Sequence, residues 1–328
     1  MTATIAQRPS LAVLGGTLAR WGVWVALAAL IIFNLVTTPR FLSWQTLQTN
    51  VTQMSAIAIL AIAMTFVIAT AGIDLSIGSV MALAGALAGV FLLGVPGLAG
   101  VPIIGIALVV LVAVAVGTVM GMANGYLVGT LQIQPIIATL VLLIAGRGIA
   151  QLITSGRLYT VENSQVIGLG RGSTFGLPNQ AWVMIAVIIL GALLVRYSTF
   201  ARYVVAVGGN ERAARTAGVP TRRVKYIVYM GTGAAAGLAA VLSIGVNGTV
   251  DTANLGLGWE FTVISAVVVG GTSLAGGRPR LAGTLGGVAL LQLLTFTLAS
   301  HNIPKEVAML VQAAVIVSAV ALQLRQRR

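Results

Sequence analysis

The chain has 328 residues, of which 58% are hydrophobic and only 8% are charged. Apolar runs long enough to cross a bilayer recur throughout, which indicates an all-α polytopic membrane protein and excludes an outer-membrane barrel, whose strands are short and alternate. With no cysteine and one histidine, the chain cannot form a disulfide framework or a Cys/His metal site. No P-loop occurs either. The sequence therefore predicts no catalytic residue, no metal site and no cofactor.

Basic residues are concentrated in a few segments. The formal net charge is +13, and most of the lysines and arginines lie in residues 196–225, at Arg278 and Arg280, and in the final RQRR. Positive charge gathered between apolar runs is typical of the cytoplasmic loops of membrane proteins, not of a nucleic-acid groove. We therefore expect contact with membrane lipid and no nucleic-acid partner.

The first apolar run predicts a membrane span that is retained. We expect residues 1–20 to form a cytoplasmic leader and residues 21–36 to form the span, because the run is too long for a signal-peptide core and has no small-residue cleavage site. Residues 41–51 follow as an interfacial segment, with Trp44 as an aromatic anchor.

Residues 52–94 are almost continuously apolar but too long for one span. The sequence AGIDLSIGS at 71–79 interrupts them, where glycine frees the backbone and Asp74 and Ser76 can cap a new helix. We expect a broken helix or a tight turn between two spans, with the carboxylate of Asp74 at the break. Its depth in the membrane depends on how the stretch is divided.

The next span carries a row of glycines. After a turn over 94–102, residues 103–129 have glycine at every fourth position from Gly117 to Gly129, which makes a smooth ridge suited to close helix packing. A further span is expected from Pro135 to residue 153. A polar outer loop at 155–180 and a short span at 181–195 follow it.

Residues 196–225 form the one long interval that cannot lie in lipid. Within it, NERAARTAGVP predicts a short helix: Asn210 is a good N-cap, Gly218 can adopt the left-handed conformation after the last turn, and Pro220 prevents continuation. Glu211 suits the positive end of the helix dipole. Such a helix is typical of a docking element on the cytoplasmic side, and the same charges also serve as a plain topology signal.

Four further apolar segments follow, at residues 226–246, 262–274, 281–298 and 307–322. The second is short enough to be a thin span or a re-entrant piece. The polar stretch 247–258 is expected to face outside, with Asp251 and Glu260 solvated at that surface or contacting a partner. The count is about ten spans, some broken or re-entrant, which places both termini in the cytoplasm. The membrane domain then covers 21–324, and 325–328 form a basic cytoplasmic tail.

Two segments share a pattern. ATAGIDLSIGSVMALAGALAG and VVGGTSLAGGRPRLAGTLGG both have a break of glycine, polar residue and leucine after an apolar run. This pattern fits a transporter built from inverted repeats.

Four motifs occur here in the same order as in a known family. They are AGIDLSIGS at 71–79, NGYLVGTLQIQPIIATL at 124–140, GGNERAARTAGV at 208–219 and GGTSLAGG at 270–277. Over residues 50–300 the chain resembles the monosaccharide-type permeases of ATP-binding-cassette importers, which serve ribose, xylose, arabinose, galactofuranose and autoinducer-2. The segment QPIIATLVLLIAGRGIAQLITSG is most similar to the galactofuranose branch. The chain departs from the family pattern at Arg278-Pro279-Arg280 and around Thr295–Thr297.

The resemblance implies a type II-like importer permease fold in the bacterial inner (plasma) membrane. It also implies a second permease subunit, identical or different, a separate cassette ATPase that hydrolyses ATP, and an extracytoplasmic sugar-binding protein. The loop matching 208–219 would carry the coupling helix that docks the ATPase. The coupling residues are then Asn210, Glu211, Arg212, Ala213, Ala214, Arg215 and Gly218. The solute would be a pentose or a furanose sugar, galactofuranose among them.

A neutral sugar needs amides, hydroxyls and an aromatic face rather than a charge. The candidates for the substrate pathway are Asp74, Asn124, Gln134, Thr139, Gln151, Asn247 and Trp259. Asp74 either lines the pathway or caps the helix that follows it. Arg147 is expected to be paired or to extend its charge to an interface.

Two alternative functions remain open from the residues alone. An ion-coupled secondary transporter needs embedded titratable groups, and the chain offers little beyond Asp74 and Arg147. A permease for another small solute, such as a branched-chain amino acid, shares the broad architecture.

Overall fold

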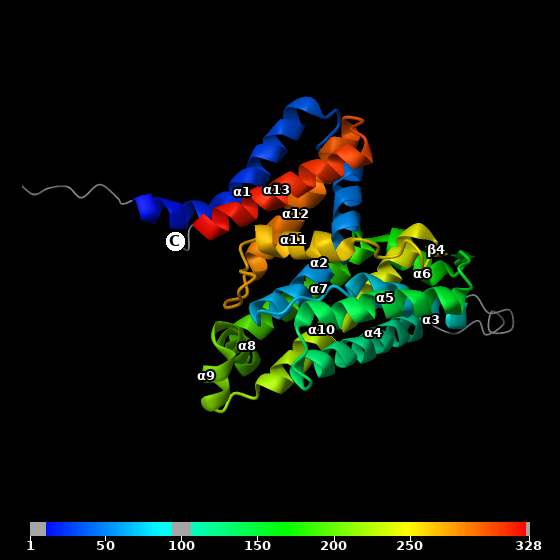
Figure 1. Cartoon of the computed structure of the whole chain (residues 1–328). Helices are drawn as coiled ribbons and strands as arrows, with labels where there is room; N and C mark the ends of the chain where they lie inside the picture. The colour runs from blue at the N-terminus through cyan, green and yellow to red at the C-terminus, as the bar shows by residue number, and fades with distance from the viewer. Residues whose placement is uncertain (1–10, 94–105, 326–328) are drawn as a thin grey trace, which may run out of the picture.

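The computed structural model describes residues 11–93 and 106–325, and these residues are almost entirely helical (Figure 1). The first half of the predicted leader, the turn predicted over 94–102 and the last three residues of the predicted tail lie outside the described residues.

Thirteen helices are present in the described part of the chain. They are α1 (Leu11–Thr37), α2 (Trp44–Ala69), α3 (Ile77–Leu93), α4 (Ile106–Gly129), α5 (Pro135–Thr154), α6 (Ser164–Arg171), α7 (Asn179–Tyr197), α8 (Thr199–Gly209), α9 (Glu211–Thr216), α10 (Thr221–Asn247), α11 (Trp259–Val269), α12 (Leu281–Ser300) and α13 (Lys305–Arg325). Two very short antiparallel pairs join β1 (Tyr159–Thr160) to β4 (Thr249–Val250) and β2 (Ser173–Thr174) to β3 (Leu177–Pro178).

Six of the described helices, α2, α4, α5, α7, α10 and α12, are long and apolar enough to cross a membrane. Shorter apolar stretches lie in α1, α3, α11 and α13. The chain is therefore a multi-pass helical membrane protein, as its apolar runs predict.

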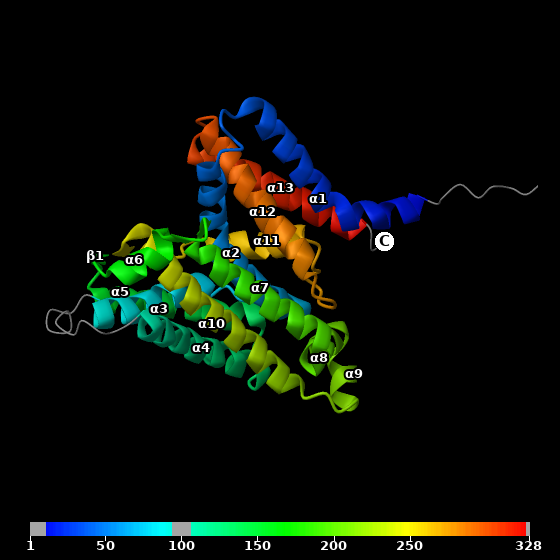
Figure 2. The same cartoon turned by 180° about the vertical axis from the view of Figure 1, so that it is seen from behind.

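Figures 1 and 2 show how the helices are arranged. Helix α10 lies side by side with α4, and α2 and α3 pack against α10. Helices α8 and α9 lie at one end of this group, and α6 with β1 and β4 lies at the other. Both ends of the described chain lie toward the end that carries α8 and α9.

The glycine ridge of α4 is the contact surface for α10, which confirms the predicted close packing. A Cβ on Gly117 would overlap the carbonyl of Gly233, and one on Gly121 would overlap the carbonyl of Tyr229. Only glycine lets the two backbones approach this closely. The ridge thus holds α10 close to α4 from Gly117 to Gly129.

The predicted break in the 52–94 stretch is confirmed, because α2 ends at Ala69 and α3 begins at Ile77. The amides of Ala71 and Gly72 turn back onto the last turn of α2, and those of Gly271 and Thr272 do the same on α11. In both caps the first residue has a positive φ, +61° at Ala71 and +91° at Gly271. The two segments that share a sequence pattern therefore share a helix ending.

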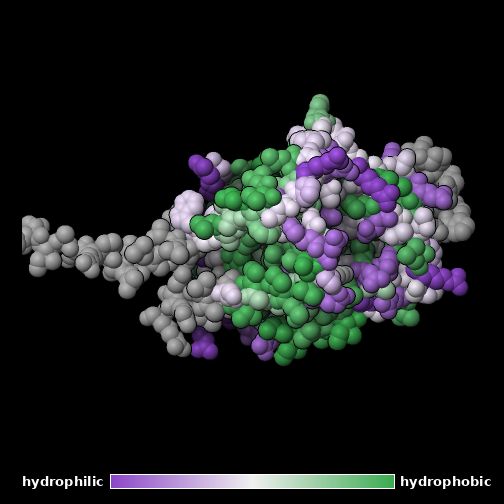
Figure 3. All heavy atoms as spheres, turned by 90° about the horizontal axis from the view of Figure 1, so that it is seen from above, coloured by the Kyte–Doolittle hydropathy of each residue, from purple (hydrophilic) through white to green (hydrophobic). Residues whose placement is uncertain are grey.

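The outer surface of the helices is apolar where no other element covers it. Figure 3 looks down on the side formed by α1 and α13 and shows a broad hydrophobic area, with hydrophilic residues gathered toward the end away from the terminal trace. Exposed apolar side chains of these two helices include Val25, Ile32 and Val36 of α1 and Met309 and Leu310 of α13. A surface of this kind suits lipid tails.

Three segments are more ordered than the sequence predicts. The interval 196–225, predicted as a loop with one short helix, also contains α8 and the start of α10. Ser198 caps α8, whose buried face is Ala201, Val204 and Val207, so a helical apolar period is present between the arginines. The 155–180 loop contains α6 and the β2–β3 hairpin, and the segment predicted as interfacial at 41–51 is largely the first turns of α2.

Residues 250–258 do not form a simple outer loop. They run along α3, with Val250 against Gly89, Leu255 against Gly85 and Gly256 against Gly78. Glu260, expected to be solvated or to contact a partner at the surface, is instead buried, with 4% of its surface exposed.

Candidate functional site

Helix α9 has the two ends that its sequence predicts. The side chain of Asn210 accepts a hydrogen bond from the Ala213 amide at 3.0 Å, which caps the first turn. At the other end Gly218 has a φ of +82°. The amides of Gly218 and Val219 return to carbonyls of the last turn at 3.1 and 3.0 Å. This is a Schellman ending, and it fixes where the chain leaves the helix.

One side of α9 is attached to the protein and the other is free. Glu211 forms an ion pair with Lys225 of α10 at 2.7 Å, and Ala214 is buried. Arg215 approaches Glu211 at 3.5 Å within the helix. Arg212, Ala213 and Arg215 are exposed. The helix therefore presents a basic face away from the membrane domain.

Three of the sequence motifs meet where α8 ends. The carbonyl of Ala69, at the end of α2, accepts a hydrogen bond from the Gly277 amide at 2.9 Å. Gly208 packs on the same carbonyl, where a Cβ would overlap the oxygen and lie 2.7 Å from the Gly277 amide nitrogen. We call these three residues the glycine junction. It connects the segment carrying α9 directly to the end of α2 and to the segment between α11 and α12.

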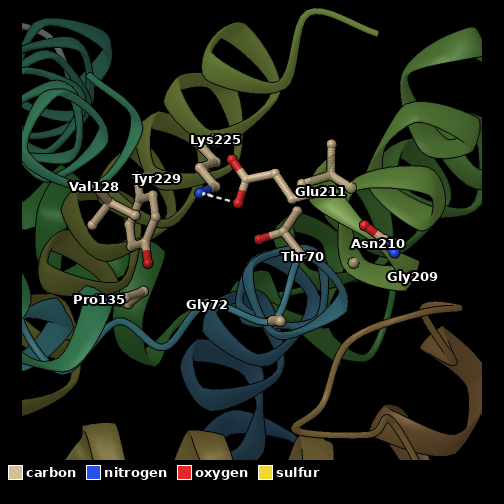
Figure 4. A pocket seen from close by; sticks show the side chains of 12 residues that line it. Thr70, Gly72, Val128, Pro135, Gly209, Asn210, Glu211, Lys225 and Tyr229 are labelled. Carbon is tan, nitrogen blue, oxygen red and sulfur yellow. Dashed lines mark hydrogen bonds and ion pairs between the residues drawn. The ribbon is translucent and has the colours of Figure 1, made fainter. Parts of the chain in front are cut away.

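A cavity of about 290 Å³ lies beside this junction. Figure 4 shows that Thr70 and Gly72 line it from the α2 side, Glu211 and Lys225 from the α9–α10 side, and Tyr229 from α10. The ion pair of Glu211 and Lys225 stands at its edge. The cavity therefore separates α9 from the break that follows α2.

Beyond the cavity, Asp74 is at the centre of a buried polar cluster. One carboxylate oxygen accepts bonds from the Ser76 amide at 2.9 Å and the Ser76 hydroxyl at 2.7 Å, and the other accepts from the Thr232 hydroxyl at 2.8 Å. The Asn124 amide donates to the Ser76 hydroxyl at 2.7 Å and, more weakly, to Asp74 at 3.4 Å. Asp74 is 1% exposed, and no described basic side chain forms an ion pair with it.

This cluster connects three helices through one side chain. Asp74 bonds to the residue before α3, to α4 through Asn124 and to α10 through Thr232. Tyr229 donates to the Ile73 carbonyl at 3.3 Å, one turn from Thr232 on α10. The bond to the Ser76 amide resembles a helix cap, and the bonds to α4 and α10 are tertiary contacts.

A family model described as the permease component of a branched-chain amino acid transport system matches residues 46–320. The chain belongs to this permease family.

The similar proteins of known function are also transport permeases. The permease is 36% identical to the galactofuranose transporter permease protein of Escherichia coli (strain K12), over 91% of this chain and 88% of the relative. It is 36% identical to the ribose import permease protein of the same organism, over 90% and 91% of the two chains. The L-arabinose transport system permease protein of that organism is 31% identical, over 92% and 89%. These matches confirm the predicted resemblance to monosaccharide permeases. No solved structure matches the chain.

The permease is thus a transport subunit and not itself an enzyme. The structure brings together only two of the seven residues predicted for its substrate pathway, Asp74 and Asn124, and both are buried. Thr139 is also buried and donates to the Pro135 carbonyl within its own helix.

The other four candidates lie apart. Gln134 precedes α5 and Gln151 lies near its end, and both are exposed. Asn247 is exposed at the end of α10, and Trp259 is half-buried at the start of α11. Their role in the pathway stays a prediction.

The sequence analysis did not identify Thr232 and Tyr229. From α10, these two side chains donate hydrogen bonds to Asp74 and Ile73 in the break between α2 and α3. The available signal was the occurrence of a hydroxyl and a phenol in a helix otherwise rich in glycine and alanine. Their position opposite the glycine ridge of α4 depends on how α10 packs, which local sequence does not give.

Proposed function

We propose that this chain is the membrane permease of an ATP-driven importer of a monosaccharide, with a pentose or a furanose sugar as the solute. The observation that carries the proposal is 36% identity, over about nine-tenths of each chain, to permeases for galactofuranose and for ribose. Galactofuranose is the sugar we would test first.

In this proposal α9 is the coupling helix that docks a cassette ATPase. Three features support it: α9 is capped at both ends, it exposes Arg212 and Arg215, and it is joined to α10 by its own Glu211 and to α2 through the preceding glycine, Gly208. A stiff, anchored helix can transmit a displacement that a loose loop would absorb.

The same proposal places both termini and α9 on the cytoplasmic side of a bacterial inner membrane. A ten-span, type II-like importer fold is supported by the six long apolar helices and by the shorter apolar stretches in α1, α3, α11 and α13. Both ends of the described chain lie toward the α8–α9 end, which agrees with an even number of spans. A second permease subunit and an extracytoplasmic binding protein complete the importer.

The test is to express the tagged chain with its chromosomal neighbours, purify it, and measure ATP hydrolysis and sugar uptake in proteoliposomes. We expect a cassette ATPase to co-purify and a sugar-loaded binding protein to stimulate hydrolysis. A chain that purifies alone and moves solute on an ion gradient would instead support the secondary transporter, with the Asp74 cluster as its ion site.

The docking assignment has its own test. Reversing the charges of Glu211, Arg212 and Arg215 together should abolish sugar uptake while the protein stays folded in the membrane. Arg157→Glu, in the exposed segment after α5, is the matched control. Normal uptake by the triple variant would refute the assignment of α9.

A further inference from the structure

Arg147 lies deep in a membrane helix. It is twelve residues into α5 (Pro135–Thr154), about 18 Å from the start of the helix and about 10 Å from its end at 1.5 Å per residue. An arginine at this depth must meet protein or water.

Its partners are backbone carbonyls rather than an acidic side chain. The guanidinium donates to the carbonyls of Thr252 and Ala253, each at 2.9 Å, and to that of Leu255 at 3.1 Å. Glu260 lies near enough to attract it electrostatically, but one oxygen of that buried carboxylate has no hydrogen-bond partner among the described residues. The charge of Arg147 is thus directed at the segment 252–255.

This segment needs such a donor. Residues 251–258 are irregular, and carbonyls outside regular structure at membrane depth are costly unless a neighbour bonds to them. Arginine presents several donors in a rigid fork, so one side chain can bond to three carbonyls at once, which lysine cannot do in the same geometry.

The inner side of the segment is fixed by packing. Gly256 lies against Gly78 of α3, and the hydroxyl of Thr252 is 2.8 Å from that of Thr154 at the end of α5. Both Thr252 and Leu255 are buried. One side of the segment is therefore packed against α3 and α5, and we call the opposite side its front.

Its front is exposed and carries polar groups beside the apolar Leu257. Ala253 and Asn254 are exposed, and the Asn254 amide donates to Asp251 at 2.7 Å. Gln151, one turn beyond Arg147 on α5, is also exposed. An exposed asparagine bonded to a carboxylate does not suit lipid tails.

We propose that Arg147 is a positioning residue for transport, which holds residues 252–255 as a fixed part of the wall of a water-filled transport route, with Asn254 facing the solute. The inference rests on the proposed permease function. It adds a residue, and a stretch of backbone, that the sequence candidates did not include.

The absence of cysteine makes the test direct. The assembled importer carrying Asn254→Cys is reconstituted in proteoliposomes and treated with a charged, membrane-impermeant thiol reagent. Leu190→Cys, on the exposed apolar side of α7, is the lipid-facing control. We expect rapid labelling of the Asn254→Cys protein, protection by transported sugar, and little labelling of the control.

Arg147→Lys is then introduced, with Arg157→Lys as the matched surface control. We expect sugar uptake to fall about tenfold and the labelling rate of Asn254→Cys to change, while the complex still assembles, because small misplacements of a positioned group have effects of this size or larger. If Arg147→Lys does not accumulate, Thr252→Val loosens the same segment by removing its bond to Thr154 and should change labelling in the same direction.

Two results would overturn the inference. One is labelling of Asn254→Cys no faster than that of Leu190→Cys. The other is a folded Arg147→Lys or Thr252→Val protein in which labelling and uptake both stay at the level of the parent. ATPase co-purification is measured on the same preparations, so failure of the proposed function is recognised separately by the absence of an assembled, ATP-hydrolysing complex.

Discussion

Gly208, the penultimate residue of α8, packs directly on the backbone carbonyl of Ala69, the last residue of α2. Ala69 lies two residues before the AGIDLSIGS motif and Gly208 begins a second motif, and Gly277, which ends a third, donates to the same carbonyl. A movement of the α8–α9 segment therefore reaches the break between α2 and α3 without passing through a flexible side chain.

The glycine junction predicts unequal effects at two adjacent glycines. A methyl group on Gly208 overlaps the Ala69 carbonyl, whereas a Cβ on Gly209 meets no described atom within 4 Å. Gly208→Ala should lower stability by about 1–3 kcal/mol through overpacking and reduce sugar uptake. Gly209→Ala should change neither. Thermal unfolding in detergent and uptake in proteoliposomes measure both effects, and equal behaviour of the two variants would contradict the proposed junction.

Removing the N-cap of α9 should destabilise that helix locally. Asn210→Ala removes the bond to the Ala213 amide and should cost about 1 kcal/mol, which matters because a six-residue helix has little stability of its own. Hydrogen–deuterium exchange over residues 211–216 should become faster. Asn210→Asp keeps a capping oxygen and should exchange like the parent protein, so a slow rate in the alanine variant would show that packing alone holds the helix.

The ion pair between Glu211 and Lys225 predicts rescue by exchange of the charges. Lys225 is largely covered, and its ammonium lies 2.7 Å from the carboxylate, so the pair holds α9 to the start of α10. Lys225→Glu alone places two acids together and should reduce uptake. The double variant Glu211→Lys with Lys225→Glu restores opposite charges and should recover much of it. A pair of this partly exposed kind contributes only about 0.2–1 kcal/mol, so the readout is coupling rather than unfolding.

Asp74→Asn should be mild. The amide oxygen can keep the bonds from Ser76, and the amide nitrogen can donate to the Thr232 hydroxyl, which has a second acceptor in the Tyr229 carbonyl at 2.9 Å. Asp74→Ala leaves the buried amide and hydroxyl donors of Ser76 without their acceptor and should cost about 1–3 kcal/mol for each such group. Both are measured as membrane expression, thermal stability and uptake. Complete loss of uptake in a well-expressed Asp74→Asn protein would assign the charge itself a role in transport.

Features that depend on neighbours along the chain could be predicted from the sequence alone. Apolar length located most of the spans, the AGIDLS stretch located the break before α3, and Asn210 with Gly218 located both ends of α9. Each of these rests on a local rule: the thickness of a bilayer, the backbone freedom of glycine, or a side chain that caps its own helix. The four motifs also identified the family.

Contacts between groups far apart in the sequence became known only from the packing of the helices. Nothing near Asp74 in sequence indicates Thr232, nothing near Gly208 indicates Ala69 or Gly277, and nothing near Arg147 indicates the carbonyls of 252–255. Local sequence sets helix ends through bonds within one turn, whereas these contacts depend on the depth and rotation at which whole helices pack. The glycine ridge between α4 and α10 sets the close approach of those two helices, which brings Asn124 and Thr232 together at Asp74.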